Sequence, residues 1–564
     1  MRIGSGHSSD YLLGAVAAGR ENYYTGATAA GEPPGRWYGR AAETLGLAGE
    51  VDPQDMNALY ERFLDPRDAR FRDPSQWDEA DTLGHTGRAY KTEDELYAAA
   101  LAKEPGADAE RRAELRVLAG QKAQRNTAFH DATFSVQKSV TVLHTAFEAE
   151  EVRAIGAAEA ARGALAEAVR TGDEQSVHRY GDAVGKADAE AEAWGQHRRA
   201  VEEAIWAGNR AALDYLTDKA GYVRVGHHGG VTGRWADAHD WTIASFFQHD
   251  SRDHDPQLHI HNAILNRVQG PDGKWRTLDG QALYKYRAAA GAVGERVMEQ
   301  HLTRTLGVEF KLRADGEARE IVGIEQPVMD LFSSRRRAIT KTTAGLVRDF
   351  QARFGREPNG LELDRLQQRA TLATRKAKSH TGETTAERLE RWDAELRAEV
   401  SGGLRKVADG VLGMRQQRAE AEAWNEDEIL GQALAEVQET QAEWRAGDLT
   451  RAISLALPDE LGQMEPGQLT ALLDGLTSKG LSKAVALDAE RPGASILPPQ
   501  LRLANGDSSY RAPGRATYAT PGHLNAESRL ARAGYDRGRV LMPDQFAGAF
   551  VKKLARQGLE LGAD

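Results

Sequence analysis

The sequence predicts an α/β protein of the α+β kind, in which a mainly antiparallel sheet is flanked by helices. Two segments, Asp131–Leu143 and His259–Leu265, alternate with the two-residue period of a β-strand. The Gly-Pro-Asp-Gly sequence at 270–273 predicts a tight turn, and therefore a hairpin, after the second segment. Residues 148–216 are rich in Ala, Glu and Arg and contain no proline, which predicts long helices that leave the sheet as an excursion.

The chain is long enough for several domains, since 564 residues correspond to three or four units of about 150 residues each. Residues 1–403 contain the predicted strands and end in basic helices near Gly402 and Gly403. Residues 404–564 are predicted to form a mostly helical region, and no Gly-x4-Gly-Lys-Ser/Thr phosphate-binding loop occurs anywhere in the chain. The sequence therefore predicts a boundary at residue 403, followed by a helical region without a P-loop.

Composition excludes several classes of site. The chain has no cysteine, which excludes disulfides, thiolate metal sites and cysteine nucleophiles. No apolar run approaches the ~20 residues that span a bilayer, so we expect a cytoplasmic protein without a membrane span. The net charge is −11, yet the stretch from Arg335 to Lys378 holds twelve Lys/Arg against four Asp/Glu. That local excess is able to attract phosphates, although a solvated helix face explains it equally well.

The most concentrated chemistry lies at 246–262, which contains four histidines and three aspartates. His259 and His261 lie two residues apart on a predicted strand, so their side chains project from the same face. His249 lies ten residues upstream of His259, on a predicted partner strand. Three imidazoles on neighbouring strands predict a divalent metal site with positions open to a substrate. Imidazole nitrogen suits Zn, Mn, Co or Ni better than Mg, and such a site accepts Mg when phosphate oxygens complete the shell. The alternative is a polar, exposed hairpin.

A cation with open positions is able to polarise a carbonyl or a phosphate, so the chain must also supply a nucleophile. Without cysteine and without a Gly-x-Ser-x-Gly turn, the candidates are metal-bound water and a side-chain hydroxyl. A tyrosine hydroxyl that attacks a phosphodiester yields a phosphotyrosine ester of similar energy, which keeps the reaction reversible.

Four ordered segments together resemble the MobF-class conjugative relaxases of the histidine-hydrophobe-histidine (HUH) endonuclease superfamily. The segments are Asn22–Tyr24, Arg36-Trp37 with Glu43–Leu47, Asp131–Val140, and Ser251–His261. The resemblance covers roughly residues 1–403 and corresponds to the N-terminal half of relaxase-helicases. Residues 518–527 resemble the linker that precedes the helicase half, so the chain is expected to be either a fragment or a form without the motor.

The resemblance implies site- and strand-specific nicking of plasmid transfer-origin DNA, with a covalent 5′-phosphotyrosine intermediate. Its implied partners are single-stranded or hairpin plasmid DNA, accessory proteins and DNA-transfer coupling proteins. The implied catalytic residues are Tyr11 as nucleophile, Tyr23 and Tyr24 as the second tyrosine pair, and Asp131 as the carboxylate that orients a histidine or accepts a proton. The implied metal ligands are His249, His259 and His261. The implied DNA-binding residues are Lys138, Arg252, Arg335, Arg336, Arg337, Arg375, Lys376 and Lys378.

Two positions depart from the family pattern. Leu12 follows Tyr11 where the family has a second tyrosine, which favours Tyr11 as the nucleophile. The third histidine of the pattern lies eleven residues before His259, where this chain has Gln248. We assign that role to His249, which requires a one-residue deletion before Ser251, with His254 as the alternative.

Three other functions are alternatives to a relaxase. A metal-water phosphodiesterase would use the tyrosines only for packing. A rolling-circle replication initiator would place its tyrosine after the histidines, whereas here the tyrosines come first. A non-catalytic origin-binding module would use the metal only to stiffen the hairpin.

Overall fold

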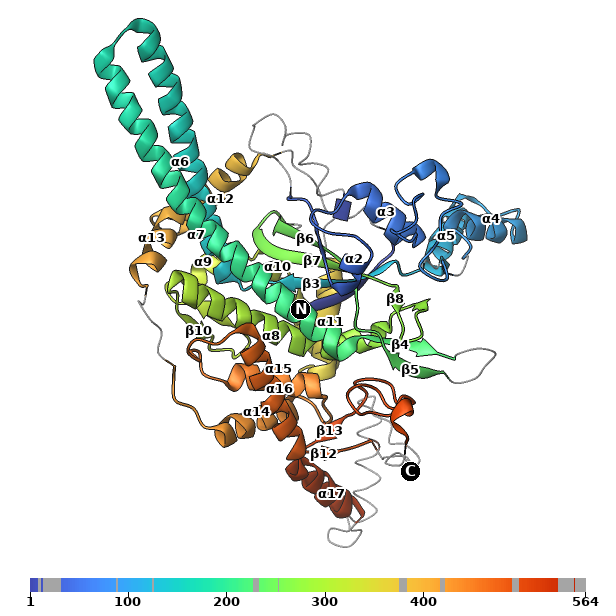
Figure 1. The fold of residues 1–564 in the computed structure, drawn as a ribbon. Helices are drawn as coiled ribbons and strands as arrows, with labels where there is room; N and C mark the ends of the chain where they lie inside the picture. Colours follow the sequence, from blue (N-terminus) through green and yellow to red (C-terminus); the bar gives the residue numbers. More distant parts are fainter. Residues whose placement is uncertain are drawn as a thin grey trace.

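The computed structural model shows a central sheet wrapped by helices, with one long helical hairpin that extends away from the rest (Figure 1). The structure describes residues 1–8, 12–13, 32–87, 90–123, 126–226, 233–251, 253–374, 383–415, 421–488, 497–535 and 552.

Five antiparallel strands form the central sheet, in the order β1-β3-β7-β6-β2. They are β1 Arg2–Gly6, β2 Arg36–Tyr38, β3 Phe129–Ser135, β6 Ile243–Asp250 and β7 Pro256–Leu265. In the register, Thr133 lies opposite His261, and Gln248 lies opposite His259. Residues directly opposite each other in an antiparallel pair project from the same face, so these four side chains share one face of the sheet. The predicted mainly antiparallel sheet is confirmed.

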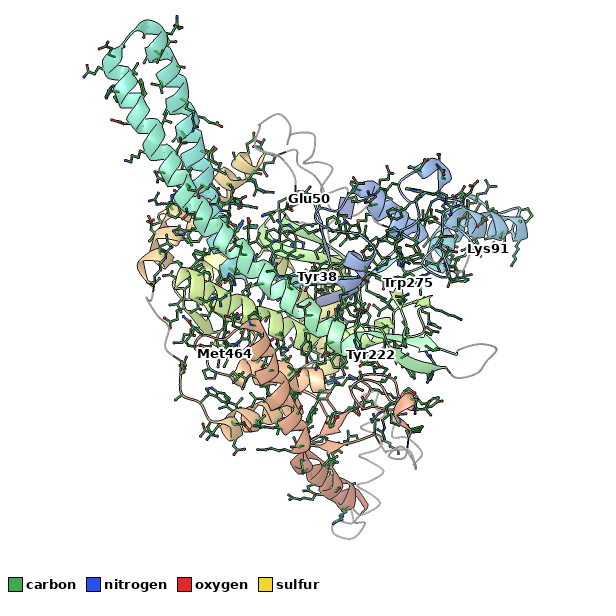
Figure 2. The ribbon with its side chains drawn as sticks, in the orientation of Figure 1. Tyr38, Glu50, Lys91, Tyr222, Trp275 and Met464 are labelled. Atoms are coloured by element: carbon green, nitrogen blue, oxygen red, sulfur yellow. The ribbon has the colours of Figure 1, made fainter. Side chains whose placement is uncertain are left out.

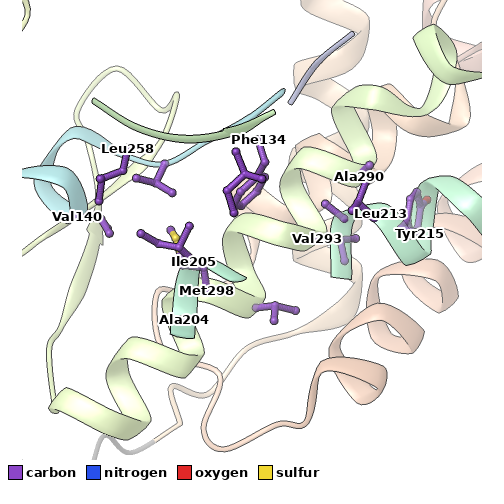
Figure 3. Close-up of a cluster of buried hydrophobic side chains, with 14 of the residues drawn as sticks. Phe134, Val140, Ala204, Ile205, Leu213, Tyr215, Leu258, Ala290, Val293 and Met298 are labelled. Atoms are coloured by element: carbon purple, nitrogen blue, oxygen red, sulfur yellow. The ribbon is translucent and has the colours of Figure 1, made fainter. Parts of the chain in front are cut away.

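The opposite face of the sheet packs on three helices, α6 Lys138–Thr171, α7 Glu174–Ala220 and α8 Gly280–Leu306. Figure 3 shows part of this core, which contains Phe134 of β3 together with Val293 and Met298 of α8. A Cβ on Gly208 of α7 would lie 2.5 Å from the carbonyl oxygen of Gly294 in α8. The close crossing of α7 and α8 therefore requires glycine at that position. Figure 2 labels Tyr38 at the edge of the sheet. Its hydroxyl donates to Asp214 Oδ1 of α7 at 2.5 Å.

The face that carries His259 and His261 is only partly covered. Two helices, α2 Arg40–Thr44 and α3 Pro53–Arg62, pack over the end of the sheet where β7 finishes. Tyr60 of α3 is buried there, and its hydroxyl donates to the Ala263 carbonyl at 2.7 Å. This cover leaves a cleft beside the first half of β7.

The long hairpin in Figure 1 consists of α6 and α7, and it contains the segment predicted as a helical excursion at 148–216. Gly172 ends α6 with φ 73°, a conformation that favours glycine, and the Asp173 side chain then caps α7 through the backbone N–H of Ser176. Buried residues lie mainly in the halves of both helices next to the sheet. Ion pairs such as Arg162 with Asp188, at 2.6 Å, join the two helices in their outer halves.

One strand is shorter than its pattern predicts. The segment predicted as a strand to Leu143 leaves the sheet after Ser135, and α6 begins at Lys138. Ser139 to Phe147 are all buried, because this first part of α6 is enclosed on every side. A helix without an exposed face has no polar stripe, so a short apolar run in it resembles a buried strand.

The remaining elements surround this core. Short paired strands form hairpins at β4 Tyr222–Val225 with β5 Arg234–Asp237, β8 Val268–Gln269 with β9 Trp275–Arg276, and β10 Phe310–Leu312 with β11 Arg319–Ile321; β12 Val485–Ala486 pairs with β13 Tyr518–Ala519. The other helices are α4 Glu93–Lys103, α5 Ala109–Lys122, α9 Gln326–Leu331, α10 Ser334–Phe354, α11 Gly360–Ala373, α12 Thr385–Glu399, α13 Gly403–Gly413, α14 Glu426–Thr440, α15 Ala446–Ala456, α16 Pro466–Ser482 and α17 Pro521–Tyr535, with single 3-10 turns at Pro74–Gln76 and Pro499–Leu501. The hairpin predicted at Gly270–Gly273 is confirmed by the pairing of β8 with β9.

The region after residue 403 contacts the earlier part of the chain directly. Helices α15 and α16 pack on α8, and Arg296 of α8 donates to the carbonyl oxygen of Pro458 at 2.7 Å. Arg319 of β11 donates to Asp459 Oδ1 at 2.8 Å. The division of the chain at residue 403 stays a prediction. Within the described ranges, none of the helices is long and apolar enough to cross a bilayer.

Candidate active site

The register of the sheet brings together an aspartate and a histidine that lie far apart in sequence. Asp131 lies opposite Ala263 and Thr133 lies opposite His261, so Asp131 is the diagonal neighbour of His261 on the same face. His261 Nδ1 lies 2.7 Å from Asp131 Oδ2, and the Thr133 hydroxyl lies 3.4 Å from Asp131 Oδ1. A carboxylate only accepts, so the Nδ1 of His261 carries the proton in this hydrogen bond.

His259 is oriented in the same way by the backbone. Its Nδ1 lies 2.8 Å from the carbonyl oxygen of Gln257, which also only accepts. The rings of His259 and His261 lie 5.0 Å apart between centroids and are inclined by 72°. In both rings Nε2 is therefore the nitrogen that holds the lone pair, which is the state a metal ligand needs.

The two histidines lie in a cleft of about 580 Å³ on the partly covered face of the sheet. Its floor is formed by β1, where Gly4 leaves room above the strand and the Phe129 ring lies over Gly6, and by β3 and β7. The lining residues are Arg2, Gly4, Ser5, Gly6, His7, Ser8, Phe129, Asp131, Thr133, Ser135, Gln248, Asp250, Ser251, Gln257, His259, His261 and Arg335. A cleft of this volume admits a group of nucleotide size.

His249, predicted as the third metal ligand, lies on the other face of the sheet. Gln248 is the residue directly opposite His259, and neighbouring strand residues project to opposite sides. His249 instead contacts Glu32, with 2.6 Å between Nδ1 and Oε2, and its ring lies 5.6 Å from that of His144. The assignment of His249 assumed a one-residue deletion, but His249 projects from the face opposite His259 and His261. The structure therefore does not bring these three histidines together.

His254, the alternative ligand, lies in the turn between β6 and β7 with φ 60°. Its carbonyl oxygen accepts from Trp392 Nε1 at 2.9 Å, and its ring lies 3.8 Å from Asp250 Oδ2. It is not among the described residues that line the cleft. Its backbone therefore anchors α12 to the turn.

The cleft offers donors that fit a divalent cation. Alongside the two imidazoles, Gln248 presents an amide and Asp250 a carboxylate to the same space. Nitrogen with neutral and charged oxygen is a donor set for zinc, manganese and similar divalent ions. The residues present therefore fit a cation, with Gln248 at the position of the third histidine.

The comparisons with known proteins identify the family of the chain. The family model described as TrwC relaxase matches residues 5–195 and 189–399, which include Asp131, His259 and His261. The chain belongs to the TrwC relaxase family. The resemblance to MobF-class relaxases predicted from the sequence is thereby confirmed.

Individual relatives are distant. The multifunctional conjugation protein TraI of Escherichia coli is 27% identical over 266 residues, which are 44% of this chain and 14% of TraI. The chain therefore matches only a small part of the length of that relative. Solved structures of conjugative relaxase TrwC with oriT DNA, one copper-bound and one metal-free, are each 20% identical, with TM-scores of 0.40 and 0.39. Each covers 70% of this chain, and the chain covers 97% and 98% of them.

A basic helix borders the cleft of this relaxase. Arg335, in the first turn of α10, lines the cleft, while Arg336 and Arg337 are exposed beside it. Asp255 fixes this helix to the start of β7, because its Oδ2 accepts from the backbone N–H of Ser334 at 2.7 Å. Of the predicted DNA-binding residues in the described part of the chain, Arg335 thus lies at the cleft, and Arg336 and Arg337 follow it on the exposed surface of α10.

Lys138, also predicted to bind DNA, has a different position. Its Nζ donates to the Pro256 carbonyl at 2.8 Å and to Gln257 Oε1 at 2.9 Å. Burial lowers the pKa of its ammonium to about 8. The side chain holds the start of β7 and is not presented to a ligand.

Several predicted residues lie outside the described ranges: Tyr11, Tyr23, Tyr24, Arg252, Arg375, Lys376 and Lys378. On either side of Tyr11 in the sequence, the next described residues are Ser8 and Leu12. Ser8 lines the cleft, and Leu12 is fully buried against α2 and α3.

The sequence interpretation missed two parts of the cleft. Strand β1 has the sequence Arg-Ile-Gly-Ser-Gly, which lacks the alternation that predicts a strand. Asp250 was also missed, although it lies two residues after Gln248 on β6, so both side chains project from the same face.

Proposed function

We propose that this relaxase nicks one strand of plasmid transfer-origin DNA by tyrosine transesterification and stays joined to the 5′ end. The observation that carries the proposal is the pair His259 and His261, oriented by Gln257 and Asp131 in a cleft that Ser8 also lines, three residues before Tyr11.

His259, His261 and Gln248 are the residues that would hold a divalent cation, which as a Lewis acid would polarise the scissile phosphate. Asp131 keeps His261 in the tautomer that this role requires, and the Gln257 carbonyl does the same for His259. Both supports belong to the sheet itself, so the ligands are held before any substrate arrives.

Tyr11 is proposed as the nucleophile on the sequence argument. Its hydroxyl oxygen forms a bond to phosphorus, while the bond from phosphorus to the 3′ oxygen breaks. The hydroxyl proton is released to solvent, and the 3′ oxygen takes up a proton. Because one phosphodiester replaces another, the strand can later be resealed or transferred, with Tyr23 or Tyr24 making the second attack.

We propose that the DNA enters the cleft as a single strand that adjoins a DNA hairpin. Arg335 lies at the cleft, and Arg336 and Arg337 extend the positive surface along the start of α10. Basic side chains at this edge would hold phosphates with a salt-dependent affinity. TrwC has been solved in complex with a 27-mer DNA that comprises its recognition hairpin and cleavage site. In transfer, we place this chain in the donor cytoplasm with accessory and coupling proteins.

The test is an adduct assay on single-stranded DNA from the transfer origin of the parent plasmid, with Mg²⁺ or Mn²⁺. A protein–DNA adduct that survives denaturation is expected, and Tyr11→Phe should abolish it while leaving DNA binding intact. Loss of the adduct only in Tyr23→Phe or Tyr24→Phe would move the nucleophile to that pair. Cleavage without any adduct would instead indicate a metal-water phosphodiesterase, and binding without cleavage an origin-binding module.

A further inference from the structure

A second group of metal-ligating side chains lies on the opposite face of the sheet from the cleft. It comprises His249 of β6, His144 of α6 and Glu202 of α7, whose ligand atoms all lie within 4.8 Å of one another. His144 is fully buried, and the side chains of His249 and Glu202 are 14% and 24% exposed. The group is therefore enclosed, yet close enough to the surface for an ion to enter.

The His249 imidazole is supported in the way seen in protein metal sites, and the His144 imidazole faces a carboxylate without a hydrogen bond to it. Nδ1 of His249 lies 2.6 Å from Glu32 Oε2, and the His249 backbone N–H also donates to Glu32. Nδ1 of His144 faces Glu148 Oε2 at 4.0 Å and has no hydrogen-bond partner within the described structure. A carboxylate behind Nδ1 is the usual outer support of a metal-bound histidine, with Nε2 directed to the ion.

The third donor is already held in place. Glu202 Oε1 lies 3.0 Å from His144 Nε2 and accepts from Arg198 Nη1 at 2.6 Å. A separation near 3 Å between a nitrogen and an oxygen is what two ligands with bonds of about 2 Å to one zinc-sized ion require. Two imidazoles and one carboxylate form a donor set that binds zinc or cobalt in preference to magnesium.

The local charges also favour a cation. Glu32, Glu148 and Glu202 surround the two imidazoles, and the nearby positive groups are Arg198 and Arg388. Buried carboxylates must be neutralised, either by a proton on an imidazole or by a bound ion.

We propose that His144, Glu202 and His249 form a second divalent-cation site, of the zinc class, which is separate from the cleft and structural. It would tie the base of the α6–α7 hairpin to β6. Through Glu32 it would also tie the segment that follows the tyrosines to the same point. The inference does not depend on the proposed nicking reaction, because no residue of the group lines the cleft.

The experiment counts Zn²⁺ bound per chain in the purified full-length protein, by native mass spectrometry and by elemental analysis after dialysis. The cleft variant His259→Ala/His261→Ala is expected to keep one Zn²⁺ per chain. It should also show the visible absorption of Co²⁺ in a nitrogen-oxygen site and a rise in Tm on adding Zn²⁺. Adding His144→Gln/Glu202→Gln to that variant should remove the ion, the absorption and the rise in Tm. His301→Gln on α8 is the matched control, since it lies in neither group, and should leave all three unchanged.

A cleft variant that binds no Zn²⁺ would overturn the proposal and leave the group as a network of ion pairs. This count decides the question even if the four-fold variant fails to fold. If the cleft itself binds no metal, the wild type and the cleft variant will both bind one ion, which separates failure of the proposed function from failure of the second site.

Discussion

His261 Nδ1 lies 2.7 Å from Asp131 Oδ2, although the two residues are 130 positions apart in the chain. The contact is fixed by the pairing of β3 with β7, where Thr133 lies opposite His261. It sets the tautomer of the histidine through a rigid element, which is how protein sites keep a ligand nitrogen available.

Asp131→Asn is expected to weaken both metal affinity and nicking by about 10–100-fold, the usual cost of losing a carboxylate behind a ligand histidine. An amide is able to donate as well as accept, so it no longer enforces a proton on Nδ1 of His261. The measurement is the rate of adduct formation as a function of Mn²⁺ concentration. Asp272→Asn, in an exposed ion pair with Arg276 on another hairpin, is the control and should behave as wild type. Equal rates for Asp131→Asn and wild type would rule out this orienting role.

The placement of His259, His261 and Asp131 on one face of the sheet was predictable in part from the sequence, because it depends on local alternation. His259 and His261 needed only the two-residue period of one strand, and Asp131 needed the same period on another. The pairing of these two strands was not derivable from periodicity, and the family resemblance supplied it.

The parts of the site that the sequence did not predict also have physical causes. His249 was misplaced because a shift of one residue along a strand exchanges the two faces, and the register of β6 against β7 shifts between Gln248 and Asp250. Its true partner, Glu32, lies 217 residues away, and no local pattern indicates that contact. The cap that Asp255 provides for α10 is equally non-local.

Gln248→His is expected to lower the Mn²⁺ or Ni²⁺ concentration for half-maximal adduct formation by about tenfold, since a third imidazole contributes on the order of 1.4 kcal/mol to binding. The reason is that Gln248, opposite His259, projects into the cleft. Adduct formation is measured because it reports only on the cleft. The placement of these two side chains would be contradicted if adduct formation lost its dependence on metal in His249→Gln while Gln248→His bound the metal no more tightly than the wild type.

Lys138→Met is expected to change the pH dependence of stability. The folded pKa of Lys138 is about 8, below the ordinary value of 10.5. Between these values the unfolded chain holds more protons, so this group makes stability rise with pH from about 8 to 10.5. After allowance for partial exposure, the rise is roughly 2 kcal/mol and should be absent from the variant. Urea unfolding at both pH values measures it, with the exposed Lys341→Met as control. If the variant instead kept the pH dependence of the wild type and bound DNA more weakly, Lys138 would be a DNA-binding residue, as the sequence predicted.

Arg335→Ala is expected to weaken binding of single-stranded transfer-origin DNA and to reduce the slope of log K against log salt by about 1, as the loss of one phosphate contact does. Arg335 is placed for this contact because it lines the cleft, and because Asp255 anchors the helix that carries it. Arg353→Ala, at the far end of the same helix, removes the same charge about eighteen residues, or roughly 27 Å, further along and should have a smaller effect. Fluorescence anisotropy across a salt series measures both slopes. Equal losses in the two variants would show that α10 acts only through its total charge, with no phosphate held at the cleft.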